Sequence, residues 1–101
     1  MITIYSVFAN KKEAQSIAEL LVKYKLAGCV NIFPIDSVYS WQGKIVKDKE
    51  FSAFIKTKNG NFKEVEQFIL KHHSYAVPCI EEIKVGNVTA KYLKWLDNVL
   101  Y

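Results

Sequence analysis

The stretch from Cys29 to Lys58 constrains the fold more than any other part of this chain. Two runs rich in β-branched and aromatic residues are separated there by Gln42-Gly43. A two-residue loop that ends in glycine predicts a β-hairpin with a type I′ turn. This loop also sets the register of the two strands, in which Asp36 faces Lys49. The sequence therefore predicts one long hairpin, with strands of about 14 residues each.

The outer half of this hairpin has no helix of its own chain to lie against. Strands of about 14 residues reach about 46 Å, whereas a covering helix of about 16 residues spans only ~24 Å. An exposed apolar ribbon of two strands is marginal in water and invites pairing. The sequence therefore predicts an obligate, closed homo-oligomer that buries the outer half. The apolar residues there are Val38, Tyr39, Trp41, Ile45 and Val46.

The rest of the chain alternates strand-like and helix-like segments. Asn10 with Glu13, and Asn61 with Glu64, have the spacing of a capping box at two helix starts. This order predicts a single α+β domain over residues 1–101, with the ferredoxin-like βαββαβ plan and an added C-terminal helix. The elements are a strand over residues 2–8, a helix after Asn10, the hairpin, a helix over Phe62–His73, a strand over Cys79–Val85 and a last helix capped by Thr89.

Composition argues against several classes of partner. The net charge is +4, but the chain contains no arginine, the residue that leads bidentate contacts to phosphate and guanine. Phe51 and Phe54 of the third strand face opposite ways, unlike the base-stacking aromatic residues of an RNA-recognition domain. No apolar run approaches the ~18 residues of a membrane span, and no secretory signal is recognisable. We expect a cytoplasmic protein that binds neither nucleic acid nor membrane.

His72-His73 is the only histidine cluster. Adjacent residues of a regular helix point about 100° apart, so both bind one metal ion only if the last helical turn frays. The structural alternative is that they complement the helix dipole, with His72 continuing the apolar stripe. His73 with a thiol from elsewhere would suit copper or zinc. Cys29 and Cys79 otherwise pack as small apolar residues.

Glu50 and Lys56 flank an apolar segment on one face of the third strand. They are candidates for a polar pocket between subunits, and a structural ion pair is favoured over a catalytic pair. The chain has no glycine-rich phosphate loop, no nucleophile elbow and no recognisable catalytic carboxylates or triad. The sequence therefore does not indicate an enzyme.

Several segments form a recognisable combination along the whole chain: 26–31 (LAGCVN), 37–44 (SVYSWQGK), Glu50, 55–57 (IKT), 72–78 (HHSYAVP), 86–87 (GN) and 92–95 (YLKW). Together they resemble the CutA divalent-cation-tolerance family. The resemblance implies a ferredoxin-like subunit in a tight homotrimer similar to PII signalling proteins, with long hairpins that add strands to neighbouring sheets. It also implies a role in divalent-metal tolerance, copper binding in some members, and no established catalytic activity.

The chain departs from the family pattern at four positions. Ser6 stands where some members have a copper-linked cysteine, Gly28 replaces a usual Ala, Ser74 a usual Pro and Cys79 a usual Glu. Cys79 is the remaining candidate for a soft ligand beside the histidines.

Two hypotheses follow. The first is a non-enzymatic homotrimer that binds copper or another divalent metal ion. The alternative is a PII-like signalling or scaffold trimer, which binds a small anionic ligand or a protein partner in clefts between subunits. The candidate metal ligands are His72, His73 and Cys79. The candidate cleft residues are Tyr39, Trp41, Glu50, Lys56 and Tyr75.

Overall fold

A computed structural model describes residues 1–100 of the chain. Its element order confirms the predicted βαββαβ plan with a C-terminal helix. Strands and helices fall where the sequence places them, to within one or two residues at each predicted boundary. The elements are β1 (Ile2–Phe8), α1 (Lys11–Lys23), β2 (Cys29–Trp41), β3 (Lys44–Thr57), α2 (Phe62–His72), β4 (Ile80–Lys84) and α3 (Ala90–Val99).

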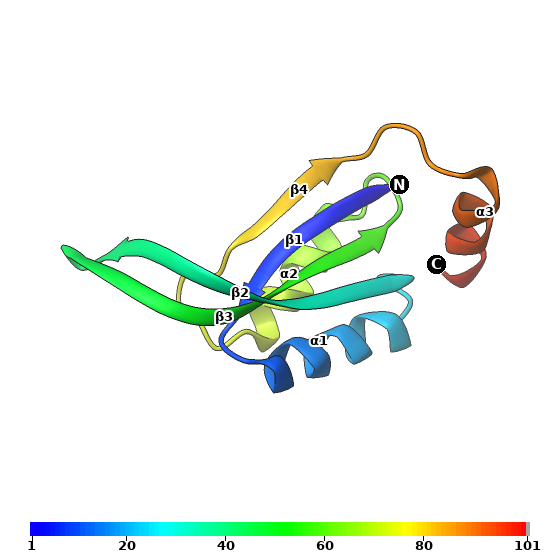
Figure 1. The fold of residues 1–101 in the computed structure, drawn as a ribbon. Helices are drawn as coiled ribbons and strands as arrows, with labels where there is room; N and C mark the ends of the chain where they lie inside the picture. The colour runs from blue at the N-terminus through cyan, green and yellow to red at the C-terminus, as the bar shows by residue number, and fades with distance from the viewer. Residues whose placement is uncertain (101) are drawn as a thin grey trace.

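The four strands form one antiparallel sheet in the order β2-β3-β1-β4. Helices α1 and α2 cover one face of it, here called the helix face, while α3 lies beyond one end of the sheet (Figure 1). The β2-β3 hairpin projects from the opposite end. No helix among residues 1–100 covers the second face, which we call the open face.

Strand periodicity explains how the core forms. Alternate residues of β1 point to the helix face, where Ile4 lies opposite Ile55 of β3 and both are fully buried. Leu21 of α1 and Ile69 of α2 pack onto this layer. A strand of period two therefore meets helices of period 3.6, and each contributes only its apolar side.

The helix starts follow the predicted capping patterns only in part. The Asn10 side chain accepts a hydrogen bond from the Glu13 N–H at 2.8 Å, so the predicted cap of α1 is confirmed. The predicted caps by Asn61 and Thr89 are wrong, because neither side chain makes a capping bond. Asn61 instead donates to the Leu26 carbonyl at 3.1 Å, and this buried tertiary contact outcompetes the local cap.

The hairpin has the predicted turn and register. Gln42 and Gly43 have φ of 49° and 76°, the two positive values of a type I′ turn. Asp36 lies opposite Lys49, and the pairing continues without a bulge through Pro34, which β2 accommodates as an edge strand. β1 pairs with β3 only from Phe51 onward, so residues 35–50 extend past the sheet. We call residues 35–50 the arm.

Gly28 is the point where α3 meets the rest of the subunit. A Cβ atom at Gly28 would lie 2.3 Å from Leu96 Cδ1 and 3.0 Å from Val99 Cγ2. Leu96 is fully buried, so its methyl group cannot move into solvent. The absence of a side chain at this position therefore lets α3 pack against the start of β2.

We predict that Gly28→Ala lowers the free energy of unfolding by about 1–3 kcal/mol, because it overpacks this contact. Gly86→Ala is the matched control, since nothing lies within 4 Å of its added Cβ. The control should change stability by no more than about 0.5 kcal/mol. Chemical denaturation of the three proteins measures both effects, and equal stabilities would contradict the close packing of α3.

Candidate functional site

The open face of the sheet carries an aromatic cluster. Tyr5, Phe33 and Phe54 project from three neighbouring strands, and their rings contact one another at centroid distances of 5.9 Å (Tyr5 to Phe54) and 5.1 Å (Phe33 to Phe54). Phe54 remains 38% exposed. The uncovered face therefore has the composition of an interface rather than that of a solvated surface.

Polar side chains gather on the same face where the arm leaves the sheet. The Tyr75 hydroxyl donates to Glu50 Oε2 at 2.6 Å, and the Tyr39 hydroxyl donates to Asp48 Oδ2 at 3.3 Å. Glu50 is only 5% exposed. The structure therefore brings together three of the predicted cleft residues, Tyr39, Glu50 and Tyr75. We call these three, with Asp48 and Cys79, the arm-root cluster.

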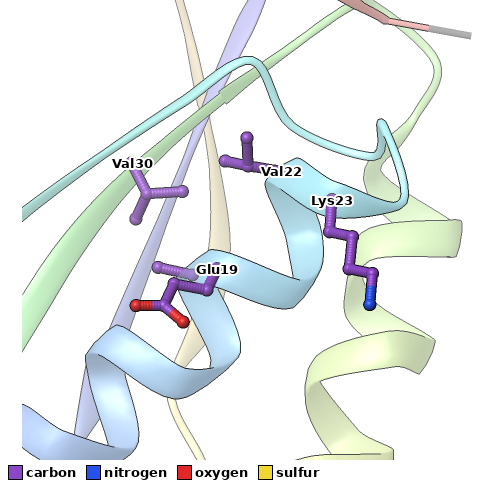
Figure 2. Close-up of a pocket in the computed structure, with 5 residues that line it drawn as sticks. Glu19, Val22, Lys23 and Val30 are labelled. Atoms are coloured by element: carbon purple, nitrogen blue, oxygen red, sulfur yellow. The ribbon is translucent and has the colours of Figure 1, made fainter.

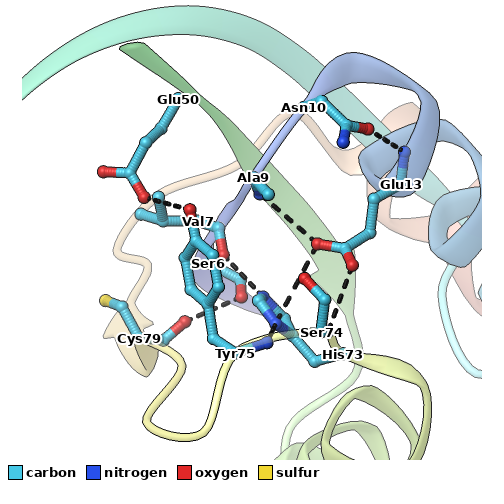
Figure 3. Close-up of polar contacts among 10 residues, drawn as sticks. All are labelled: Ser6, Val7, Ala9, Asn10, Glu13, Glu50, His73, Ser74, Tyr75 and Cys79. Atoms are coloured by element: carbon cyan, nitrogen blue, oxygen red, sulfur yellow. Dashed lines mark hydrogen bonds and ion pairs between the residues drawn. The ribbon is translucent and has the colours of Figure 1, made fainter. Parts of the chain in front are cut away.

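Tyr75 is positioned by the loop between α2 and β4, which is held on both sides (Figure 3). His73 Nε2 lies 2.7 Å from the Val7 carbonyl oxygen, and His73 Nδ1 accepts from the Tyr75 N–H at 3.0 Å. The Glu13 carboxylate accepts from the Ser74 N–H at 3.1 Å. These bonds tie the loop to the end of β1 and to the start of α1, and so fix the phenol over Glu50.

Carboxylates dominate the electrostatics of the arm-root cluster. Burial raises the pKa of the Tyr75 phenol, and the hydrogen bond to Glu50 raises it further. Partial desolvation raises the pKa of Tyr39, followed by the charge and hydrogen bond of Asp48. Both phenols therefore remain neutral donors to carboxylates. This environment favours a cation over an anion.

The Cys79 thiol lies in the same negative environment. Its pKa is raised by burial first and then by the charges of Glu81 and Glu50. Because the thiolate is the form that binds metal ions, a metal ion at Cys79 would have to displace this proton. Ser6 is fully buried, and its hydroxyl donates to the Cys79 carbonyl oxygen at 2.7 Å.

The predicted metal ligands His72, His73 and Cys79 do not converge. The His73 side chain is fully buried and both its ring nitrogens are hydrogen-bonded, so no lone pair is available to an ion. His72 lies exposed on α2, with Nδ1 2.9 Å from the Phe68 carbonyl oxygen. Nowhere in residues 1–100 are three His, Cys, Asp or Glu side chains placed to hold a metal ion. A copper site of the thiol-plus-histidine kind does not fit one chain, and metal binding stays a prediction.

Two predicted cleft residues lie elsewhere. Lys56 is on the same face of β3 as Glu50, but about 20 Å away at ~3.3 Å per residue. Its Nζ lies 5.4 Å from the centre of the Tyr92 ring, and Cys29 faces it across the β2-β3 pair. We call Cys29, Lys56 and Tyr92 the base cluster. Trp41 is at the tip of the arm and 46% exposed.

Sequence reasoning did not predict Asp48 or Tyr92 as members of these clusters, nor Glu13 as a partner of the loop that holds Tyr75. Glu13 was expected only in the capping pattern at the start of α1. Burial raises the pKa of Tyr92, and its interaction with the Cys29 thiol adds to this. The predicted hairpin register already places Cys29 opposite Lys56. The contacts of Glu13 and Tyr92 depend on loops, whose conformation the register does not determine.

Two hollows on the surface are lined by few of the predicted site residues. One of about 410 Å³ lies between α1 and the base of β2 and is lined by Ala18, Glu19, Val22, Lys23 and Val30 (Figure 2). Another of about 440 Å³ lies at the ends of α1 and α2, and His72 is the only predicted site residue that lines it. Both are on the helix side of the molecule, away from the arm-root cluster. No helix within residues 1–100 is long and apolar enough to span a membrane.

Comparison with known proteins gives consistent matches along the whole chain. A family model described as CutA1 divalent ion tolerance protein matches residues 2–99. The divalent-cation tolerance protein CutA of Thermotoga maritima is 42% identical over 95% of this chain and 95% of its own length.

Solved structures match equally well. A periplasmic divalent cation tolerance protein CutA from Archaeoglobus fulgidus superimposes with a TM-score of 0.95 at 40% identity, covering 98% of both chains. A PII-like protein CutA from Nostoc superimposes with a TM-score of 0.92 at 25% identity, covering 100% of this chain and 98% of that one. These matches agree with the element order and with the long arm.

We predict that Tyr75→Phe lowers the free energy of unfolding by about 1–3 kcal/mol, because it leaves the buried Glu50 carboxylate without its hydroxyl donor. Tyr39→Phe is the matched control, since Asp48 is exposed and its bond is longer. The control should cost less than about 0.5 kcal/mol. If chemical denaturation shows equal losses for the two variants, the Tyr75 hydroxyl does not satisfy Glu50.

Proposed function

Because the chain belongs to the CutA1 divalent ion tolerance protein family, we propose that it acts in divalent-cation tolerance as a closed homotrimer. In this proposal it binds ligands or partners at the boundaries between subunits, binds metal ions through His72 on the helix side, and catalyses no reaction. The polar clusters of the open face lie at those boundaries. A cytoplasmic location stays a prediction.

The arm is the observation that carries the proposal. Beyond the sheet it pairs only with itself, yet Val38 is 68% exposed and Ile45 79% exposed. An apolar ribbon of this length is stable when a further surface covers it. Further copies of the chain supply such a surface in a closed ring without leaving an open end.

The open face supports the same assembly. Its aromatic cluster is continuous with the arm, because both lie on strands β2 and β3. Packing three such faces together would bury Phe54 and the inner side of each arm. The arm-root cluster would then lie at the edge of a neighbouring subunit, where Glu50 and Tyr75 are shielded from water.

In this proposal the exposed imidazole of His72 is the metal ligand of each subunit. His73 holds the loop that positions Tyr75 and is not a ligand in this proposal. Because His72 lies on the helix side and not on the packed open faces, a bound molecule completes the ligand set around the metal ion in this proposal. Copper and zinc both suit an imidazole ligand.

The alternative function is that of a PII-like signalling or scaffold trimer. The likeness to the PII-like Nostoc protein favours it. In this case a small anionic ligand would bind near Lys56, since the arm-root cluster is negative. Metal binding would then be incidental.

We predict that Trp41→Asp weakens trimer assembly at least tenfold, because a charge replaces an aromatic side chain that the assembly removes from water. Leu70→Asp is the matched control, as Leu70 is 51% exposed on α2 of the helix side. Sedimentation velocity over a dilution series measures assembly. A wild-type chain that sediments as a compact monomer would overturn the proposed trimer, and a fully trimeric Trp41→Asp variant would overturn the role of the arm tip.

We further predict that His72→Ala weakens saturable Cu(II) or Zn(II) binding, whereas His73→Ala lowers the free energy of unfolding by about 2–4 kcal/mol and leaves metal affinity unchanged. Isothermal titration and chemical denaturation separate the two effects. Absence of saturable binding would remove the metal role. A thermal shift with nucleotides or other anions, but not with metals, would favour the PII-like alternative.

A further inference from the structure

Glu50 is a buried carboxylate without a cation. Glu50 is 5% exposed, and within the described part of the chain its carboxylate accepts a hydrogen bond only from the Tyr75 hydroxyl and makes no ion pair. A neutral hydroxyl compensates only part of the cost of burying a carboxylate. The environment of Glu50 is therefore incomplete in a single subunit.

Lys56 lies at the other end of the open face and has no carboxylate partner among residues 1–100. It is half-buried beside Cys29, and its ammonium group lies against the Tyr92 ring rather than against a carboxylate. None of the ion pairs within residues 1–100 involves Lys56. An aromatic ring is a weaker partner for a lysine than a desolvated carboxylate.

The two residues cannot neutralise each other within one chain. Both are on β3, both project from the open face, and about 20 Å of paired strand separates them. The open face is thus negative at the arm root and positive at the base. In a head-to-tail ring the negative end of one face meets the positive end of the next.

We propose that Lys56 of a second copy of this chain is the counter-ion of Glu50, so that each subunit boundary contains one Glu50–Lys56 ion pair beside Tyr75. The inference rests on the proposed homotrimer and assigns the contact that closes each boundary. The sequence-based expectation of a structural ion pair between these residues is not met within one chain, and the proposal assigns the pair to two subunits.

Other lysines of the strands fit less well. Lys44 is the only other strand lysine on the open face, and it is exposed at the arm tip beside the turn. Lys47 and Lys49 project from the opposite side of the arm, and Lys49 is 3.6 Å from Asp36. Lys84 faces the helix side, opposite Ile2. Lys56 alone combines the open face, partial burial and a missing anion.

The first test is zero-length coupling of the wild-type protein with a carbodiimide, which joins a carboxylate to an amine in direct contact. Peptide mass spectrometry of the covalent dimer band should identify Glu50 joined to Lys56. A covalent oligomer in which Glu50 is joined to Lys44 instead would overturn the assignment. A protein that sediments as a monomer and gives no covalent oligomer would overturn the homotrimer itself.

The second test exchanges the charges. Glu50→Lys and Lys56→Glu should each weaken trimer assembly at least tenfold, as expected when one partner of a buried interfacial pair is lost. The double variant Glu50→Lys/Lys56→Glu should recover assembly to within about threefold of wild type. Lys63→Glu on α2 is the control for a charge reversal away from the open face and should leave assembly unchanged.

Two milder variants cover the case in which the reversals prevent folding. Glu50→Gln keeps an acceptor for the Tyr75 hydroxyl but removes the charge, and Lys56→Met keeps the apolar stem without the ammonium group. Each should weaken assembly, and the double variant should be no weaker than either single one because the pair is already lost. Additive losses, or a trimer insensitive to all four single substitutions, would overturn the ion pair while leaving the trimer intact.

Discussion

The arm, residues 35–50, extends past both helices that cover its own sheet, and the rest of the structure depends on this mismatch of length. A β-strand rises about twice as far per residue as an α-helix. Strands of 13 and 14 residues therefore cannot be covered by helices of 13 and 11 residues. The arm therefore lies without a helix over it, and its apolar residues Val38 and Ile45 stay exposed in the single chain.

The loop between α2 and β4 places Tyr75 against Glu50 and so completes the candidate site. It has no regular structure, yet hydrogen bonds hold it to Val7 of β1 and Glu13 of α1, and His73 of the loop itself also binds the Tyr75 N–H. His73 Nε2 donates while Nδ1 accepts, so the neutral imidazole is built into the backbone network. A histidine used in this way holds the tyrosine that contacts Glu50, and its role is one of positioning.

Sequence reasoning succeeded where structure is local or periodic. The turn at Gln42-Gly43 fixes the register of the whole hairpin, because each pair follows from the one before it. The cap of α1 by Asn10 is equally local. Sequence reasoning failed where a side chain binds a partner distant in the sequence and not a local one. Asn61 has the spacing of a cap but binds the Leu26 carbonyl, a partner that is set only when α1 and α2 pack together.

The same reason explains the incomplete prediction of the site. Tyr39, Glu50 and Tyr75 were expected at one cleft and are together, because the first two are on paired strands and the loop follows a predictable helix. The burial of both nitrogens of His73 has no signature in the spacing of the sequence. Nor does the contact between Lys56 and Tyr92, which depends on how α3 returns to the sheet.

The departures from the family pattern fit a structural function of this loop. A proline at position 74 could not donate to Glu13, whereas the Ser74 N–H does so at 3.1 Å. Ser6 binds the Cys79 carbonyl in place of offering a thiol to a metal ion. Both positions contribute hydrogen bonds that hold the loop, Ser6 from β1 and Ser74 to Glu13 of α1. The Ser6 hydroxyl and the Ser74 N–H therefore both support the loop that positions Tyr75, and neither position supplies a thiol ligand in this chain.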